Sequence, residues 1–166
     1  QGEELGLSQA QIPIERLRDP EAIANWPSNQ GRDGARTPMP WSTDGRFGGF
    51  SKVEPWLPMP AEHKQRAVAV QEKDPHSVLA CTRQLVALRK AHSALRLGKF
   101  VSLKLPSPLL GFERVGAGER VRCLFNLSGD AVRCPMTKEG QVLFVSGRID
   151  RAKGMIGGLT ACWLRL

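Results

Sequence analysis

Residues 31–41 restrict what this chain can fold into more than any other segment. They read GRDGARTPMPW and combine two arginines, an Asp-Gly pair, two prolines and a tryptophan. Proline fixes φ and removes a backbone donor, so the segment is unsuited to a helix interior or a central strand. It is also too rigid for a linker and too polar for a core. We therefore expect an ordered loop that holds guanidinium groups toward a ligand.

The chemistry of this loop suits a sugar. Arginine recognises carboxylates, phosphates or vicinal hydroxyls through several donors in one plane. Arg32 and Arg36 flank the Asp33-Gly34 turn, and Trp41 offers an aromatic platform. A sugar presents apolar ring faces and polar edges, which match that combination. Alternatively, the arginines hold the loop by bonding neighbouring carboxylates. Asp33 is expected to be a turn-forming Asx residue.

Charge narrows the range of partners. The 166 residues carry a formal net charge of +8. Residues 1–60 hold 6 Lys and Arg against 8 Asp and Glu, whereas residues 61–166 hold 18 against 8. The basic excess is scattered, without a run of five like charges or interleaved aromatics. We therefore expect a solvated basic surface and no nucleic-acid partner.

Cysteine usage and hydropathy exclude several classes of protein. Cys81, Cys123, Cys134 and Cys162 form no C-x-x-C pair, and no His stands at zinc-ligand spacing. Free thiols in a reducing compartment are expected, with no metal site and no cofactor. The most apolar window, 154–164, is shorter than the ~20 residues that cross a bilayer, and no signal peptide is recognisable. These features predict a cytoplasmic protein without a membrane partner.

The first residues, QGEE, lack an initiator Met, which is typical of a cut or truncated chain. Neighbouring residues of a strand face opposite sides, so Glu3 and Glu4 cannot serve one reacting centre. One of them can face a pocket, and a salt bridge, for example to an arginine, is the alternative for each. His63, His76 and His92 lack a Ser, Cys or Asp partner at a recognisable spacing and are expected to be structural or solvated.

Three regions follow one another along the chain. Residues 1–60 are rich in Pro and Gly and leave room only for helical turns near 14–18 and 20–25. Residues 61–98 are helix-compatible, weakly over 62–73 and strongly after Asp74, a good N-cap followed by Pro75. Apolar residues then recur at spacings of three and four up to Leu95, and Gly98 is a stop signal.

The third region, residues 99–166, changes to short strands separated by turns. The predicted strands are 100–105, 109–115, 120–127, 131–135, 141–145 and 158–166. Six strands at this spacing indicate a small antiparallel sandwich.

Several motifs resemble one enzyme family. QGEELGL at 1–7, DP at 19–20, WP at 26–27, GRDGARTPMPW at 31–41 and WLP at 56–58 are similar to the α-glucosidase and oligo-1,6-glucosidase branch of glycoside hydrolase family 13. The resemblance continues through DPHSVL at 74–79, LVALRKAHSAL at 85–95 and FNLS at 125–128. It covers essentially the whole chain, and GRDGARTPMPW is its most specific motif.

The resemblance implies an α+β fragment with two parts. Residues 1–98 correspond to the last βα portion of a (β/α)8 barrel, with the segment after strand eight, a long loop excursion and a final helix over 74–97. In the family, residues 62–73 are largely extended, and we adopt that expectation here. Residues 99–166 correspond to a C-terminal antiparallel β-sandwich domain.

The implied activity of the parent enzyme is hydrolysis of α-glucosidic bonds of short oligosaccharides with retention. Retention uses a nucleophilic and an acid/base carboxylate about 5 Å apart. In the family these are an Asp after strand four and a Glu after strand five, with a third Asp after strand seven. None of them matches a position here, so no catalytic residue and no activity are expected of this piece alone. The match makes Arg36 the first and Arg32 the second substrate contact, supported by Glu4, Asp33 and Trp41.

A second class of function remains open. The chain can be a non-catalytic β-sandwich module that contacts carbohydrate or protein, with the upstream loop as an appendage. An isolated barrel edge exposes apolar surface, so self-association is also expected. The choice between α-1,4 and α-1,6 linkages and the substrate length depend on family positions that this chain does not contain, as do the family's metal sites.

Overall fold

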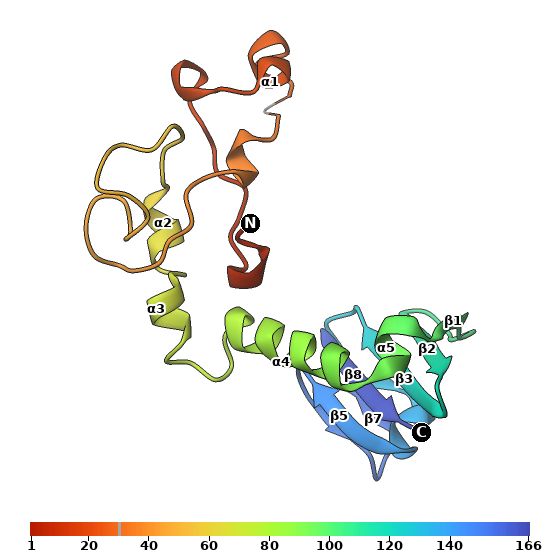
Figure 1. The fold of residues 1–166 in the computed structure, drawn as a ribbon. Coiled ribbons are helices and arrows are strands. Elements are labelled where there is room, and N and C mark those ends of the chain that lie inside the picture. Colours follow the sequence, from red (N-terminus) through yellow and green to blue (C-terminus); the bar gives the residue numbers. More distant parts are fainter. Residues whose placement is uncertain (30) are drawn as a thin grey trace. The chain divides into compact units, whose positions relative to one another are not determined.

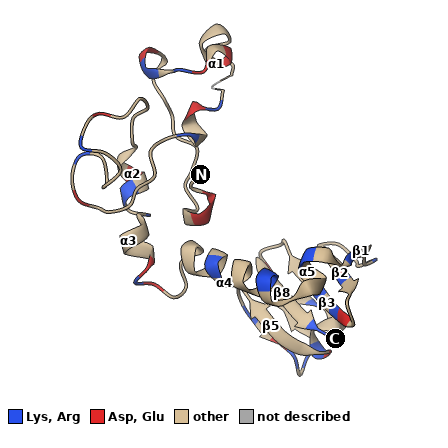
Figure 2. Ribbon diagram, viewed as in Figure 1, with Lys and Arg blue, Asp and Glu red and all other residues tan. Residues whose placement is uncertain are grey.

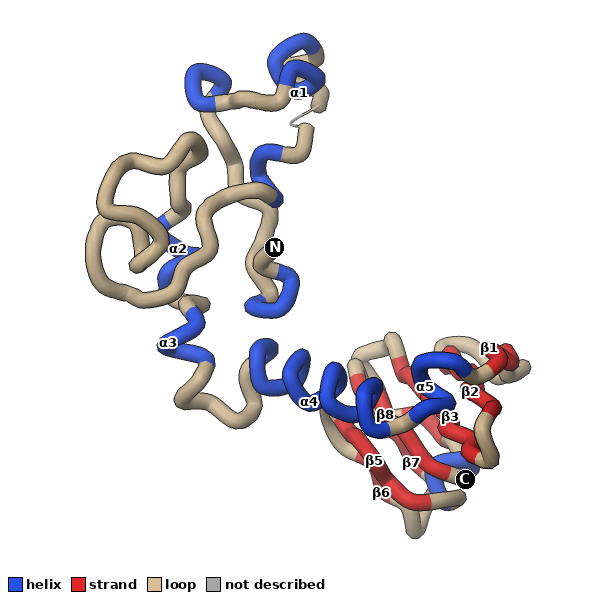
Figure 3. Tube along the Cα trace, in the orientation of Figure 1, coloured by secondary structure: helices blue, strands red, loops and turns tan. Residues whose placement is uncertain are grey.

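The computed structural model describes residues 1–29 and 31–166. It divides into two compact units, Gln1–Arg83 and Gln84–Leu166, each of which is described by itself. The first unit consists mainly of loops and short helices, and the described strands all belong to the second (Figure 1, Figure 3).

The first unit has few and short regular elements, as its prolines predict. Helix α1 spans Pro20–Ala24, and the Asp19 side chain accepts the Glu21 N–H at 3.3 Å at its start. Proline at the first helical position loses no hydrogen bond, so Asp19-Pro20 is a local start signal. Both helical turns predicted here are confirmed. The 3₁₀ helices of the unit are η1 Glu3–Leu5, η2 Ile14–Arg16 and η3 Asp33–Ala35.

Residues 62–73 differ from the extended structure expected by family resemblance. They contain helix α2, Ala61–Lys64, and helix α3, Val68–Gln71. The backbone N–H groups of Val68 and Ala69, which begin α3, donate to the carbonyls of Pro40 and Trp41, both at 3.0 Å. A helix leaves its first N–H groups without internal partners. The far end of the arginine loop supplies those partners, and a short helix forms.

The helix predicted over 74–97 is two helices, α4 at Val78–Ala91 and α5 at Ser93–Leu97. Ser77, not Asp74, caps α4: its hydroxyl accepts the Ala80 N–H at 3.2 Å. Asp74 instead closes a turn by accepting the His76 N–H at 2.8 Å. His92 has extended backbone angles and separates the two helices.

The apolar stripe of α4 is only partly covered. Leu79 is buried, whereas Val78 is 42% and Val86 47% exposed. These residues recur at helical spacing, so one face of the helix presents hydrocarbon to solvent in the described chain.

The second unit contains two antiparallel sheets. The larger has the order β1-β2-β3-β8-β5 and the smaller the order β4-β7-β6. The large sheet comprises β1 Lys99–Ser102, β2 Leu109–Gly116, β3 Glu119–Asn126, β8 Thr160–Arg165 and β5 Gln141–Val145. The small one comprises β4 Val132–Arg133, β7 Met155–Ile156 and β6 Ile149–Asp150, and the 3₁₀ helix η4 is Pro135–Lys138. The antiparallel strands predicted for this region are present, whereas β6 and β7 are not predicted, because a strand of two residues shows no alternation.

Both faces of the large sheet are buried over part of their area. Successive residues of a strand face opposite sides. Thus Cys123 of β3 packs with Ala94 and Leu95 of α5, whereas Leu124 joins a second cluster with Ile156 of the small sheet.

A hydrogen bond between His92 and Glu119 holds α5 against β3 within this unit. His92 Nδ1 lies 2.5 Å from Glu119 Oε1, and Glu119 Oε2 accepts the Ala94 N–H at 3.4 Å. The hydrogen bond from His92 is the main cause that lowers the pKa of Glu119. The first turn of α5 is thereby tied to the start of β3.

Charged residues are distributed over both units. Lys and Arg occur on α2, α4, α5 and several strands, whereas acidic residues lie on η1 at the N-terminus (Figure 2).

Within residues 1–29 and 31–166, no helix combines the length and apolar character that spanning a membrane requires.

Candidate functional site

The arginine loop, residues 31–41, turns sharply at its first residue. Gly31 has φ +59°, and a Cβ there would lie 2.7 Å from Ala22 Cβ and 2.9 Å from Asp19 Oδ2. Glycine is therefore required both for its left-handed backbone and for the close approach of α1. Further along, Pro38 and Pro40 are buried. The loop is ordered by packing at both ends, as its composition predicts.

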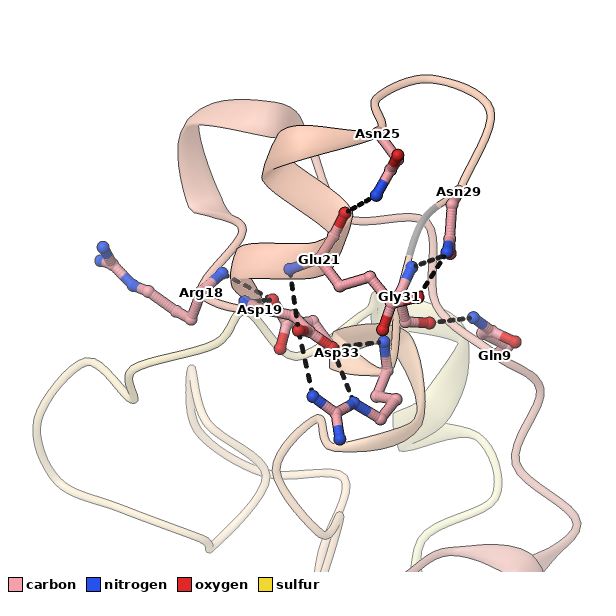
Figure 4. Close-up of polar contacts among 9 residues, drawn as sticks. Gln9, Arg18, Asp19, Glu21, Asn25, Asn29, Gly31 and Asp33 are labelled. Atoms are coloured by element: carbon pink, nitrogen blue, oxygen red, sulfur yellow. Dashed lines mark hydrogen bonds and ion pairs between the residues drawn. The ribbon is translucent and has the colours of Figure 1, made fainter.

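Asp19, which Figure 4 labels beside Asp33, holds Arg32 in this loop. Its carboxylate accepts the Arg32 backbone N–H at 3.0 Å, Nε–H at 2.9 Å and an NH2 hydrogen at 3.2 Å. The side-chain hydrogen bonds from Arg32 hold the pKa of Asp19 well below its usual range. Asp19 is 2% exposed, whereas the Arg32 side chain remains 64% exposed. The structure therefore confirms one of the two alternatives for Arg32, namely that it bonds a neighbouring carboxylate.

Asp33 is a long-range anchor and not the expected Asx turn. Its Oδ2 accepts the backbone N–H of Arg18 at 2.5 Å and of Asp19 at 2.8 Å. These donors lie 15 and 14 residues earlier in the sequence, so no local turn pattern could indicate them. The Asp33 side chain is fully buried, and Oδ1 has no hydrogen-bond partner within the described chain. Asp19 and Asp33 together join the start of α1 to the arginine loop.

Arg36 follows this anchored segment. Its backbone N–H donates to the Asp33 carbonyl at 2.9 Å and ends η3. The residue is half-buried, and its guanidinium makes no hydrogen bond or ion pair with the residues that the structure describes. A guanidinium on a restrained backbone with unused donors can bind hydroxyls or a carboxylate without first breaking a bond.

A cavity of about 190 Å³ lies between the first segment of the chain and η3. Its lining includes Gln1, Glu3, Gly34, Thr37 and His63. His63 is buried, with Nε2 2.9 Å from the Ser8 carbonyl and Nδ1 3.4 Å from Thr37 Oγ1. The imidazole thus joins three segments, in agreement with the structural role expected for this histidine. The sequence did not associate His63 with the loop because 26 residues separate it from Thr37.

The two glutamates of the first segment lie on 3₁₀ helix η1, not on a strand. Glu4 Oε2 accepts the Gly2 N–H at 2.8 Å, and neither glutamate forms an ion pair within the described residues. Gln1 instead links this segment to the loop by donating to the Thr37 carbonyl at 3.2 Å. Trp41 is 51% exposed. Trp41 is the last residue of the loop and Glu4 lies on η1, and neither of them bonds an arginine among the described residues.

The described carboxylates and thiols show little sign of chemical activation. Asp19 and Asp33 are buried and accept several N–H groups, so neither is available as a nucleophile. Within residues 1–29 and 31–166, no three His, Cys, Asp or Glu side chains cluster as metal ligands. Burial raises the pKa of the Cys123 thiol to about 12 and that of Cys162 to about 11. What the site offers is hydrogen bonding from arginines on a fixed loop.

Comparisons with known proteins agree with the features of the loop. The α-amylase catalytic domain family matches residues 1–98. A probable α-glucosidase of Rhizobium meliloti (strain 1021) is 50% identical over 131 residues, which cover 79% of this chain and 24% of that protein. An oligo-1,6-glucosidase of Parageobacillus thermoglucosidasius is 29% identical over 147 residues, which cover 77% of this chain and 26% of that one.

Solved structures lead to the same family. The crystal structure of the α-glucosyl transfer enzyme XgtA is 39% identical, with a TM-score of 0.80, and covers 99% of this chain and 32% of that one. The chain thus spans about a quarter of the length of the curated relatives it matches. Because the family model matches residues 1–98 and a probable α-glucosidase is 50% identical over 131 residues, the family is established. The chain belongs to the α-amylase family, glycoside hydrolase family 13, in the branch of the α-glucosidases and oligo-1,6-glucosidases.

Proposed function

We propose that this chain is the C-terminal part of a retaining α-glucosidase that hydrolyses α-glucosidic bonds of short oligosaccharides. The observation that carries the proposal is the contrast between two arginines of one loop. Arg32 is bound by Asp19, whereas the Arg36 guanidinium has all its donors free among the described residues. A loop anchored through one arginine and presenting another is suited to hold a sugar hydroxyl in a fixed position.

Arg36 is the proposed first substrate contact. Arg32 is the second, through the NH1 group that the Asp19 pair leaves unused. Asp33 anchors the loop by accepting the backbone N–H groups of Arg18 and Asp19. Glu4, on η1, and Trp41, the last residue of the loop, are proposed to support the sugar site. In this arrangement the arginines bind and orient the sugar, and the carboxylates that break the bond come from other parts of the barrel.

The proposed domain organisation follows the same assignment. Residues 1–98 form the end of the catalytic barrel, and residues 99–166 form a C-terminal β-sandwich. The half-exposed stripe of α4 supports a further packing partner, since a helix of a complete barrel buries that face. In the isolated chain the same stripe favours self-association.

Two assays test the proposal. The 166-residue chain alone should not hydrolyse p-nitrophenyl α-D-glucoside, because none of its carboxylates matches the catalytic positions of the family. Turnover by the isolated chain at the rate of a complete enzyme would contradict the assignment.

The second assay uses the complete enzyme that carries this segment. Arg36→Ala should lower kcat/KM by about 100-fold, because a positioning group is lost. Arg36→Lys should recover little, since lysine lacks the planar fork. The control is Arg18→Ala, an exposed arginine whose side chain points away from the Asp19–Asp33 cluster in Figure 4. Equal kcat/KM for Arg36→Ala and Arg18→Ala would exclude Arg36 as a substrate contact.

A second candidate is a non-catalytic module for carbohydrate or protein contact. The compactness of Gln84–Leu166 as a separate unit favours it. A complete enzyme that contains this segment distinguishes the two candidates. α-Glucosidase activity that Arg36→Ala lowers would support the first candidate over the second.

A further inference from the structure

The segment that begins at the last residue of the arginine loop, residues 41–60, forms a second ordered loop. The N–H groups of Trp41 and Ser42 donate to the Gly48 carbonyl at 2.8 and 2.9 Å, and Lys64 Nζ donates to the Gly45 carbonyl at 2.7 Å. Gly48 has φ +55°, and a Cβ there would lie 2.8 Å from Met59 Sδ. This segment is therefore closed on itself and has little room to collapse further.

A cavity of about 220 Å³ lies against this second loop. One part of its lining is apolar and comes from Phe47, Pro55, Pro58 and Met59. The other part consists of Arg16, Arg46 and Glu54. The cavity thus has an apolar side and a side that carries both hydrogen-bond donors and acceptors.

Glu54 lies between the two arginines. Its Oε1 is 2.8 Å from Arg16 NH2, and its Oε2 is 3.8 Å from Arg46 NH2. The Glu54 side chain is 50% exposed, so its oxygens keep free lone pairs. The Arg46 guanidinium lies 5.1 Å from the centre of the Phe47 ring, a cation–π contact that orients it. Ion pairs this exposed add little stability, so their hydrogen-bonding capacity is available to a ligand.

The composition of the cavity selects one ligand class. A purely apolar ligand would displace the water that hydrates three charged side chains and offer no hydrogen bond in return. An anion would be repelled by the Glu54 carboxylate, which lies between the two guanidiniums. A neutral pyranose satisfies every group: its hydroxyls donate to Glu54 and accept from the arginines, and its C–H face contacts the prolines and Met59.

We propose that the cavity of Arg16, Arg46, Phe47 and Glu54 binds one pyranose unit of an α-glucoside. The choice of glucose as the sugar rests on the proposed function, but binding by the cavity does not require catalysis. It can be measured on this chain itself.

The test is titration of the ¹⁵N-labelled chain with isomaltose, maltose and, separately, inorganic phosphate. Either disaccharide should shift amide resonances of residues 46, 47 and 54, and phosphate should not. Glu54→Gln should weaken sugar binding about tenfold, because a charge-assisted hydrogen bond is lost. The matched control is Glu72→Gln, because Glu72 forms an equally short pair with Arg83, 2.8 Å, and is 48% exposed outside the cavity.

The outcomes separate clearly. Equal weakening by both variants, shifts caused by phosphate alone, or no shift with either sugar would overturn the proposal. Arg16→Gln gives a second measurement if Glu54→Gln alters the amide spectrum of the free chain. Loss of binding here leaves the Arg36 assay unaffected, so this inference and the proposed function can fail independently.

Discussion

Asp19 binds Arg32 through three hydrogen bonds, one from the backbone N–H and two from the guanidinium. The same carboxylate accepts the Glu21 N–H and so caps α1. One carboxylate thereby serves a helix start and a loop 13 residues later. The same pair determines which arginine of the loop is free. Arg32 is occupied by Asp19, so Arg36 is the guanidinium that remains available to a ligand.

Acid should weaken the first unit through Asp19. The pKa of Asp19 in the folded chain is lowered by Arg32, so the folded state binds fewer protons than the unfolded state as pH falls. The stability from this pair is complete above the ordinary Asp pKa and is lost as pH drops through the lower folded value. The Tm from tryptophan fluorescence should therefore stay level from pH 7 to about pH 5 and fall as the pH is lowered further.

The variant Asp19→Asn should flatten that decline, since an amide has no charge to lose. Trp26, Trp41 and Trp56 belong to the first unit, so a Trp163→Phe background makes the fluorescence specific for it. Asp44→Asn is the control, because Asp44 is exposed and pairs with no cation among the described residues. An identical pH profile for the chain and for Asp19→Asn would refute the linkage.

Removal of the Asp33 carboxylate should destabilise the arginine loop. Asp33→Ala leaves the N–H groups of Arg18 and Asp19 without acceptors, which should cost about 2 kcal/mol. Asp33→Asn keeps one acceptor oxygen and should cost less. Urea denaturation measures both, with Asp130→Ala at an exposed carboxylate as the control. A loss no greater than that of Asp130→Ala would exclude Asp33 as an anchor.

Gly34 should tolerate no side chain. A Cβ at this position would overlap the Ala10 carbonyl oxygen, which is backbone and cannot rotate away. We expect Gly34→Ala to lower the free energy of unfolding by about 2 kcal/mol, as overpacking does. Gly129→Ala provides the comparison, because a Cβ at Gly129 meets no atom within 4 Å. Equal thermal stability of the two variants would show that η3 can move away from residue 10.

The four cysteines should differ in reactivity toward a disulfide reagent. Burial raises the pKa of Cys123 to about 12 and of Cys162 to about 11, so their thiolate fractions at pH 8 are very small. Cys81 is the half-buried thiol of the set. One thiol should react quickly with Ellman's reagent in the native chain, and Cys81→Ser should abolish that phase. Rapid titration of three or four thiols would contradict the burial of the sheet core.

Structural elements could be predicted from the sequence where the residues that form them are neighbours in the chain. Asp19 and Pro20 start α1 because the cap and the helix are adjacent. The antiparallel strands follow from alternation over five or more residues. The predicted start of α4 is wrong because two residues, Asp74 and Ser77, can each cap a helix. Only the hydrogen bond from the Ala80 N–H selects Ser77.

Contacts between distant residues could not be predicted in this way. Asp33 looks like a turn residue until the N–H groups of Arg18 and Asp19 approach it. His92 lacks a partner in the sequence, yet Glu119, 27 residues later, pairs with it. Such pairs form only when distant parts of the chain come together in the fold. No periodicity of the sequence predicts them.

The sequence by itself determined the family, the ordered arginine loop and the change from helices to strands, because each depends on residue types close together in the chain. Only the tertiary structure decided which arginine is bound and which is free. The family resemblance ranks Arg36 before Arg32, but the residue types alone do not show which guanidinium is paired. The fold brings one buried carboxylate, Asp19, to the first of them, and the geometry of a bidentate pair allows it to hold only one.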